Sequence, residues 1–305
     1  MSSTRQRSLL AGLGFTSLWI IGLGLFTAFP VAASLYYSFC DYSILKEPVW
    51  IGLENYQQLW RDDLFWRSLR NTLFYAALSV PLGTLVALAL AMLLNQDVRG
   101  KAFFRVAFYL PSIVPVVASV MLWTWIFNGQ FGLLNYALAP LLAPFGLEPP
   151  LWLSDPTWAK PALVVMSLWG VGNAMVIYLA GLQNVPKHLY EAADIDGATA
   201  WQRFRHVTLP MLAPVIYFNV IMAIIGSLQV FTQAFILAAA AGGGDGTGGS
   251  PARSTLFYTI YLFSTAFYDL KMGYASAMAY VLFVLIAGLT WAATRLTRRH
   301  VEDAA

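Results

Sequence analysis

The chain has 305 residues, of which 59% are apolar and only 11% are charged, and its formal net charge is +3. A soluble protein carries about 25% charged residues, so this composition excludes a water-soluble globular domain and indicates a membrane protein. The small net charge provides no dense basic patch for nucleic acid, and the single cysteine, Cys40, excludes an internal disulfide.

Six apolar stretches are long enough to cross a bilayer, since about 20 residues rising 1.5 Å each span about 30 Å of hydrocarbon. They cover about residues 9–37, 71–94, 106–127, 162–183, 209–240 and 272–294. None of the six contains Asp, Glu, Lys or Arg. Ionisable groups within a bilayer usually mark ion or proton pathways, so their absence argues against a proton-coupled carrier. We expect residues 1–305 to form one all-α integral membrane domain.

The first stretch has an alternative interpretation as a secretory signal peptide. Arg5 and Arg7 precede the apolar run, and residues 31–34 could pass for a cleavage site. The apolar core of a signal peptide has about 7–15 residues, and this run is about twice that length. We therefore expect it to stay in the protein as the first span.

Long connections follow the first, third and fifth spans. Segments 41–70 and 128–161 are rich in aromatic residues, which suits a membrane–water interface. The glycine tract 242–250 is typical of a flexible loop. Residues 255–268 are apolar but too few to span, so we expect a short interfacial helix there.

The distribution of basic residues predicts the orientation. Eleven Lys and Arg residues fall in the two termini and in the connections after spans two and four, whereas seven fall in the longer connections on the opposite side. The side with more basic residues is normally cytoplasmic. We therefore expect both termini and segment 184–210 in the cytoplasm, with segments 41–69 and 242–270 outside.

Segment 184–210 is a polar element between the fourth and fifth spans. Pro186 can start a helix, because the first turn does not need its missing N–H group. Residues 189–195 then form about two turns, which Gly197 can end at a positive φ angle. Thr199 can cap a second short helix. The segment is therefore predicted to be a compact knob joined stiffly to two spans.

The knob carries a spaced motif that resembles the EAA loop of ABC-importer permeases. Glu191-Ala192-Ala193 is followed by Gly197 and, after nine intervening residues, by residues 207–210, Val-Thr-Leu-Pro. Val207 stands where the family usually has Ile. The resemblance implies a cytoplasmic coupling helix that docks onto a separate ATPase. The implied contact residues are Tyr190, Glu191, Ala192, Ala193, Asp196 and Gly197.

Further motifs resemble the first of the two permeases in carbohydrate importers of the maltose or glycerol-phosphate type. They are Phe29-Pro30, Tyr37-Ser38-Phe39, Gly52-Leu53, Asn55-Tyr56, Asn71-Thr72 and Gly273-Tyr274-Ala275-Ser276-Ala277. The glycine tract departs from the family pattern, because Asp245 replaces a proline. The resemblance implies a six-span type I importer permease in the cytoplasmic membrane. Its implied partners are a second permease, two ATPase subunits, an external solute-binding protein, a di- or oligosaccharide and membrane lipid.

The chain carries no recognisable machinery for chemistry of its own. Gly100-Lys101 is the only Gly-Lys pair, and it lacks the spacing of a phosphate-binding loop. The three histidines, His188, His206 and His300, have no metal-ligand spacing. We expect no enzyme activity, no cofactor and no metal, with ATP hydrolysed on another subunit.

Uncharged polar and aromatic residues within the fourth and fifth spans are candidates for the substrate pathway. They are Trp169, Asn173, Ser227, Gln229 and Gln233. On a continuous helix, Trp169 would share a face with Asn173, and Gln229 with Gln233. Amides and aromatic rings suit uncharged sugars, although the same amides commonly hydrogen-bond one membrane helix to another. Import of glycerol phosphates and a stand-alone carrier remain alternative functions.

Overall fold

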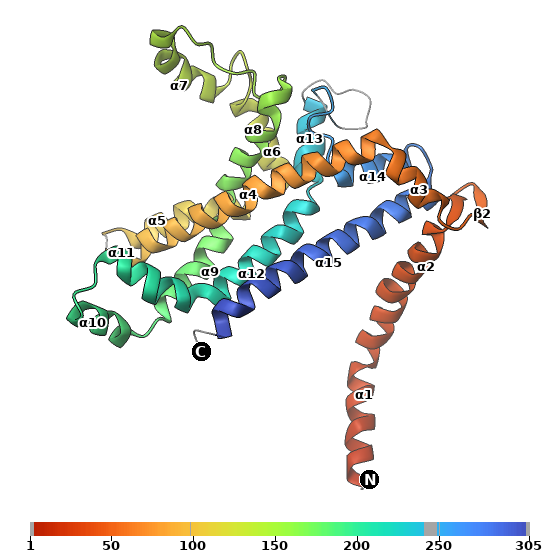
Figure 1. Ribbon diagram of the computed structural model, residues 1–305, viewed down its shortest axis with the longest axis horizontal. Helices are drawn as coiled ribbons and strands as arrows, with labels where there is room; N and C mark the ends of the chain where they lie inside the picture. Colours follow the sequence, from red (N-terminus) through yellow and green to blue (C-terminus); the bar gives the residue numbers. More distant parts are fainter. Residues whose placement is uncertain (1–2, 98, 241–248, 250, 303–305) are drawn as a thin grey trace. The chain divides into compact units, whose positions relative to one another are not determined.

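The computed structural model describes residues 3–97, 99–240, 249 and 251–302, and most of their regular structure is helical (Figure 1). One short antiparallel hairpin is the exception within these residues. Its strands are β1 (Cys40–Ser43) and β2 (Lys46–Trp50). The helices are α1 (Ser3–Leu23), α2 (Phe29–Ser38), α3 (Glu54–Arg61), α4 (Asp63–Asn95), α5 (Lys101–Tyr109), α6 (Val116–Ile126), α7 (Leu133–Leu142), α8 (Pro156–Trp169), α9 (Gly172–Gln183), α10 (Lys187–Ile195), α11 (Ala200–Arg203), α12 (Leu209–Leu228), α13 (Thr232–Ala240), α14 (Tyr258–Phe267) and α15 (Met272–Glu302).

The described helices provide up to six candidate membrane spans, which agrees with the six predicted stretches. Four are single helical segments that are long and apolar enough to cross a bilayer. They are Gly12–Ser38, Asp63–Asn95, Ala200–Leu228 and Met272–Arg295. The second of these begins at Asp63, eight residues before the predicted apolar stretch, and these eight residues include Asp63, Arg67 and Arg70.

The other two candidate spans are bent pairs of helices. Lys101–Ile113 and Val116–Ile126 meet at an angle of 101°. Pro115 follows Val114, whose ψ angle of 131° is extended, as expected for a residue before proline. Pro156–Trp169 and Gly172–Gln183 meet at 47°, with Gly170 at the break. Glycine is a poor helix former, so the break falls where the helix is weakest.

The predicted continuous helix over 209–240 is wrong, because the chain leaves the helix near Gln229. The Gln229 N–H group bonds to the Gly226 carbonyl, which closes α12 in a tight turn. The Thr259 hydroxyl then donates to the Val230 carbonyl. A carbonyl freed from the helical ladder needs such a partner inside a membrane, so the contact with Thr259 stabilises the break.

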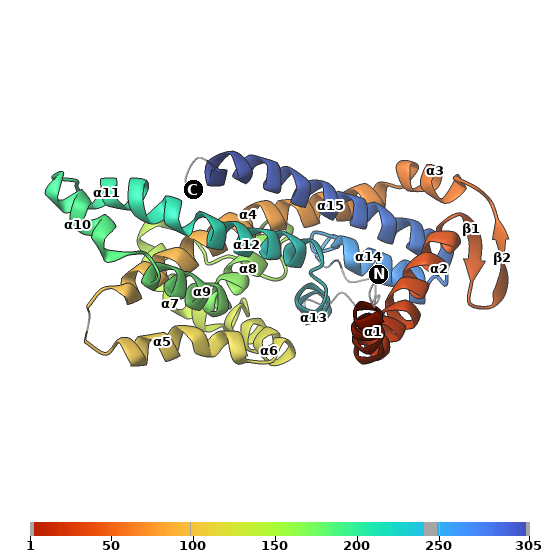
Figure 2. The same cartoon turned by 90° about the horizontal axis from the view of Figure 1, so that it is seen from below.

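The chain divides into two compact units, and the boundaries fall at the start of α4 and within α14 and α15. Unit 2 comprises Asp63–Tyr261 and Val284–Ala305. In it, α4, α9 and α12 lie side by side (Figure 1 and Figure 2). One apolar core cluster of this unit surrounds Phe127 and Phe257, and a second surrounds Met175 and Leu212.

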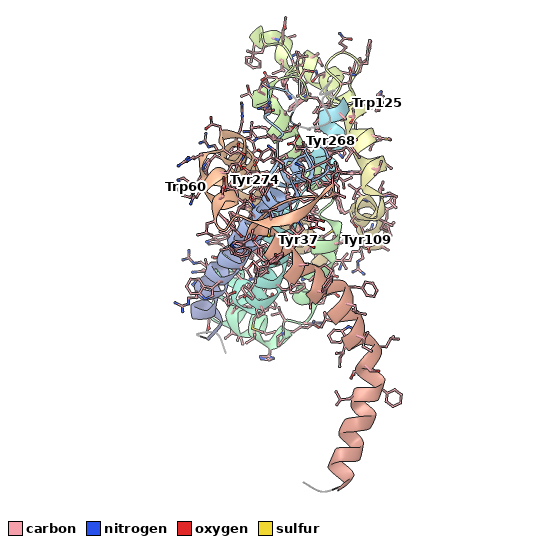
Figure 3. The ribbon with its side chains drawn as sticks, turned by 90° about the vertical axis from the view of Figure 1, so that its right-hand side faces the viewer. Tyr37, Trp60, Tyr109, Trp125, Tyr268 and Tyr274 are labelled. Carbon is pink, nitrogen blue, oxygen red and sulfur yellow. The ribbon has the colours of Figure 1, made fainter. Side chains whose placement is uncertain are left out.

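Unit 1 comprises Met1–Asp62 and Leu262–Phe283. Asn55 is buried and donates from Nδ2 to the carbonyls of Ser38 and Cys40, each at 2.9 Å. The Tyr274 hydroxyl, labelled in Figure 3, donates to Asp62 Oδ2 at 2.6 Å. Asn55 therefore joins α3 to the end of α2 and to the start of the hairpin, and Tyr274 joins α15 to the end of α3.

The predicted interfacial helix over 255–268 corresponds to α14, which has ten residues and does not qualify as a candidate span. The glycine tract 242–250 lies almost entirely outside the described residues.

Candidate functional site

The predicted knob is present as residues 184–208, here called the coupling element. It contains α10 and α11 and lies at one end of unit 2, beyond α9 and α12 (Figure 1 and Figure 2). Pro186 is the N-cap of α10, as its fixed φ angle of about −61° allows. The chain passes from α11 through a π-helical turn, Phe204–Thr208, directly into α12. The element is thus continuous with a candidate span, as predicted.

A glycine-dependent turn ends α10. Gly197 has a φ angle of +72°, and its N–H group bonds to the Asp194 carbonyl at 3.1 Å. The Ala198 N–H group bonds to the Ala193 carbonyl at 2.9 Å. These two bonds define a Schellman motif, which satisfies the last helical carbonyls. The prediction that Gly197 ends this helix at a positive φ angle is confirmed. An ordinary L-residue resists this backbone conformation.

A capping box starts α11. The Gln202 N–H group donates to Thr199 Oγ1 at 3.4 Å, and the Thr199 N–H group donates to Gln202 Oε1 at 2.8 Å. Two of the otherwise unpaired N–H groups at the helix start are thereby satisfied. Thr199 therefore caps the second helix, as the sequence predicted.

Side chains also fasten α10 to the segment that follows it. Arg203 Nη1 lies 2.6 Å from Asp194 Oδ1. The hydroxyls of Tyr190 and Thr208 are 3.0 Å apart and share a hydrogen bond. The ion pair is partly exposed, and such pairs stabilise by about 0–1 kcal/mol. The two contacts nevertheless fix the orientation of α10 against the start of α12.

The exposed surface of the coupling element differs from the predicted one. Tyr190 and Ala193, two of the implied contact residues, are half-buried, so they offer less surface to a partner than the exposed residues do. The large apolar side chains that face outward are Ile195, which is 87% exposed, and Trp201, which is 65% exposed. Sequence reasoning missed Trp201, although a tryptophan in a polar loop is a visible signal. Of the predicted contact residues, the exposed ones are Glu191, Ala192, Asp196 and Gly197.

Two adjoining cavities lie among the helices of unit 2. The larger has a volume of about 610 Å³, and the smaller about 270 Å³. Ser227, Gln229 and Gln233 line the larger cavity, and Trp169 and Asn173 line the smaller one. Gln233 borders both. The structure thus brings all five predicted pathway residues to the cavities.

The helix geometry that brings these five residues to the cavities differs from the prediction. Trp169 ends α8 and Asn173 begins α9, across the 47° bend, so the two do not share a continuous helix face. Gln229 caps α12 and Gln233 lies in α13, across the second break. Helix breaks leave backbone near a cavity and allow side chains from both halves to reach it. The breaks therefore shape the site.

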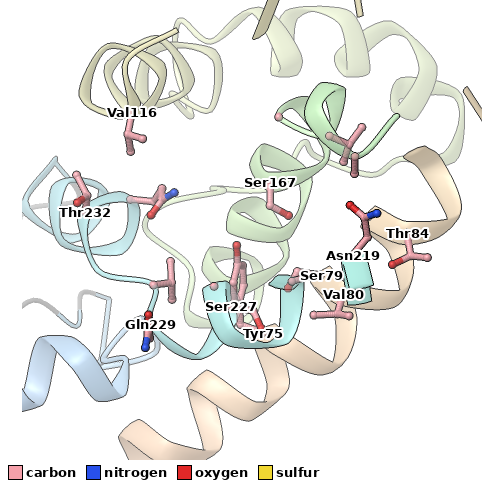
Figure 4. A pocket seen from close by; sticks show the side chains of 18 of the residues that line it. Tyr75, Ser79, Val80, Thr84, Val116, Ser167, Asn219, Ser227, Gln229 and Thr232 are labelled. Atoms are coloured by element: carbon pink, nitrogen blue, oxygen red, sulfur yellow. The ribbon is translucent and has the colours of Figure 1, made fainter. Parts of the chain in front are cut away.

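Sequence reasoning missed the contribution of α4 to the larger cavity. Its lining includes hydroxyl-bearing residues from α4, α8 and α9, together with Asn219 of α12 (Figure 4). These residues are Tyr75, Ser79, Thr84, Ser167 and Tyr178. A signal was available, because Tyr75 and Ser79 are four apart and share one face of α4. Among the described residues, no Asp, Glu, Lys, Arg or His lines either cavity.

Two unlike features therefore lie in unit 2, an uncharged polar site among membrane helices and a polar helical knob at the end of two of those helices. Together they define a polytopic membrane protein with a polar cavity among its helices. The sequence profile described as "Binding-protein-dependent transport system inner membrane component" matches residues 79–301, and the chain belongs to this family.

Known relatives extend the similarity over most of the chain. The probable ABC transporter permease protein YesP of Bacillus subtilis (strain 168) is 41% identical over 292 residues, which cover 95% of this chain and 91% of YesP. The lactose transport system permease protein LacF of Rhizobium radiobacter is 38% identical over 245 residues, covering 79% of this chain and 78% of LacF.

Solved structures agree on the fold. A chain in the crystal structure of a bacterial alginate ABC transporter, in complex with an alginate pentasaccharide-bound periplasmic protein, superposes with a TM-score of 0.78. It is 24% identical, and the match covers 98% of this chain and 96% of that chain. The predicted family and permease fold are confirmed. The chain belongs to a family of inner-membrane transport components.

Proposed function

We propose that this chain is a transmembrane subunit of an ATP-driven ABC importer that carries a di- or oligosaccharide across the cytoplasmic membrane. The observation that carries the proposal is the uncharged, hydroxyl- and amide-lined cavity of about 610 Å³. It is bordered by α9 and α12, the same helices that hold the coupling element. Sugars present many hydroxyl groups, which these side chains can meet as donors and as acceptors. Relatives named for lactose and for trehalose and maltose transport support this class of solute.

The coupling element is proposed to dock onto one of two separate ATPase subunits. Its exposed surface combines Ile195 and Trp201 with the carboxylates of Glu191 and Asp196. Exposed aromatic and aliphatic side chains beside polar groups are typical of anchoring residues at protein interfaces. The contacts that fasten α10 to α12 would pass a movement of the ATPase to the helices around the cavity.

A second, homologous permease and an external solute-binding protein complete the proposed complex. The family description itself names dependence on a binding protein. Many apolar side chains of the candidate spans are exposed in the single chain, Phe15 at 91% and Leu18 at 82% among them. Membrane lipid and the second permease are the proposed surroundings of such side chains. Both termini and the coupling element are proposed to be cytoplasmic, from the distribution of basic residues.

Two alternative functions fit the cavities less well. A glycerol-phosphate importer needs cations to bind the phosphate group, and no Lys or Arg lines the cavities among the described residues. A stand-alone proton-coupled carrier usually needs an ionisable group at membrane depth, and the lining residues described contain no carboxylate.

Co-purification with the ATPase tests the proposal. We expect an affinity-tagged chain, extracted with its transport system, to retain the ATPase, and Ile195→Asp to release it by adding a charge to the docking surface. Tyr136→Asp is the matched control, because Tyr136 is 81% exposed on α7, away from the coupling element. Retention of the ATPase by the Ile195 variant would remove this surface from the interface. Absence of the ATPase from the unmodified complex would favour a stand-alone carrier.

A further inference from the structure

Three basic side chains converge in the first turns of α4 and α8, and they are called here the basic cluster. They are Arg67 and Arg70 of α4 and Lys160 of α8. Lys160 Nζ donates to Asn71 Oδ1 at 3.3 Å and lies 4.8 Å from the centre of the Phe74 ring. Arg67 is one turn before Asn71, and Arg70 is one turn before Phe74, so both arginines share a side of α4 with the residues that contact Lys160. Both also act electrostatically on the Lys160 ammonium group.

The position of Lys160 is built into the fold. Asn71 is buried, and its Nδ2 donates to the carbonyls of Arg253 and Leu256 at 3.1 and 3.0 Å. These two bonds fix the amide group, so its oxygen is held toward Lys160. The ammonium group is therefore placed before any ligand binds, which lowers the entropy cost of binding.

The charge of the basic cluster has no acidic partner among the described residues. The two ion pairs in the described part of the chain lie within residues 97–101 and within the coupling element. The cluster also contains three of the seven basic residues on the predicted external side, where basic residues are disfavoured. Like charges that are held together repel one another, so the arrangement calls for a bound anion.

The outward face of α4 is apolar next to the basic cluster. Phe74 is 42% exposed, Leu78 37% and Leu85 62%. Positions 67, 70, 74, 78 and 85 recur at intervals of three, four or seven residues, so they lie along one side of the helix. The described lining of the two cavities includes none of them. From Arg70 to Leu85 the helix rises about 22 Å, which exceeds half of a hydrocarbon layer about 30 Å thick.

We propose that the basic cluster binds the phosphate headgroup of an anionic phospholipid, whose acyl chains lie along the apolar face of α4. Arginine pairs with two phosphate oxygens at once, and lysine adds a point charge. A lipid matches both parts of this surface in their order along the helix, whereas an acidic side chain of a protein would match the cations alone. The inference is independent of the solute that the chain carries.

Bound lipid would join two walls of the larger cavity. Tyr75 of α4 and Ser167 of α8 both line that cavity, and the basic cluster draws on the same two helices. A phosphate held by Arg70 and Lys160 therefore keeps α4 and α8 together near one end of their spans. Each basic residue beside an anionic lipid strengthens binding about fivefold.

Lipid binding to charge-neutralised variants tests the inference. Arg67→Gln, Arg70→Gln, Lys160→Gln and the combined variant are purified with their partner subunits. Lys46→Gln is the matched control, because Lys46 is an exposed cation on the same predicted side but belongs to the β-hairpin and to no candidate span. Each complex is titrated with phosphatidylglycerol and, separately, with phosphatidylcholine. Bound lipid is counted by native mass spectrometry, and the melting temperature is measured in phosphatidylcholine alone.

We expect each single variant to bind phosphatidylglycerol about fivefold more weakly at one site, and the combined variant more than about tenfold more weakly. Binding of phosphatidylcholine, the melting temperature and the Lys46 variant should be unchanged. Equal binding of phosphatidylglycerol to the combined variant and to the unmodified complex would overturn the inference. Loss of the second permease or of the solute-binding protein from the combined variant in phosphatidylcholine alone would also overturn it, by assigning the cluster to a protein partner.

Discussion

Replacement of Gly197 should uncouple the transporter without disturbing its membrane domain. The φ angle at this position is +72°, and no atom lies within 4 Å of the place where a Cβ would be. Steric crowding therefore adds nothing, and the whole cost is backbone strain of about 1–2 kcal/mol for an ordinary L-residue. A change of that size alters the population of a local structure by a factor of about 5–30. Because the turn is exposed, the strain should loosen α10 while the spans remain intact.

The assay is ATP hydrolysis stimulated by the loaded solute-binding protein in a reconstituted complex. We expect Gly197→Val to lower stimulation most, Gly197→Ala less and Gly197→Asn least, since Asn tolerates the left-handed region. Gly288→Ala is the control, because Gly288 also has no atom within 4 Å of its Cβ position but lies within helix α15. Alanine there should be neutral or slightly stabilising. Full stimulation in the Gly197→Val complex would refute the reasoning.

Three further outcomes are expected. In a Cys40→Ser background, an impermeant thiol reagent applied to intact cells should label the Tyr136→Cys variant but not the Arg205→Cys variant. The reverse labelling would show that the predicted topology is inverted. Asn55→Ala should lower the free energy of unfolding by about 1–3 kcal/mol, because the carbonyls of Ser38 and Cys40 lose their buried donor. An unchanged thermal unfolding midpoint would contradict this prediction. Asn173→Ala should slow sugar uptake with an unchanged melting temperature, whereas a fall in melting temperature at full uptake would assign Asn173 to helix packing.

The parts of the fold that depend on neighbours in sequence were predictable. Pro186, Gly197 and Thr199 each act on backbone within a few residues of themselves, so their roles in the coupling element could be predicted without a structure. The spans were equally predictable, because composition alone decides whether a stretch can cross a bilayer.

The parts that depend on distant contacts were not predictable. The break after α12 is stabilised by Thr259, which lies 29 residues from the carbonyl of Val230. The half-buried state of Tyr190 reflects its bond to Thr208, 18 residues later. No local pattern encodes such contacts. For the same reason, the predicted pathway omitted α4, whose Ser79 reaches the cavity only because α4 packs against α9 and α12.

ATP hydrolysis on a separate subunit is proposed to drive sugar through this chain. This proposal is tested most directly in proteoliposomes that contain the purified complex, with ATP inside and the loaded solute-binding protein outside. We expect radiolabelled lactose, maltose or trehalose to accumulate only when both ATP and the binding protein are present, and collapse of the proton gradient should have no effect. Accumulation that follows an imposed proton gradient and does not need ATP would contradict the account.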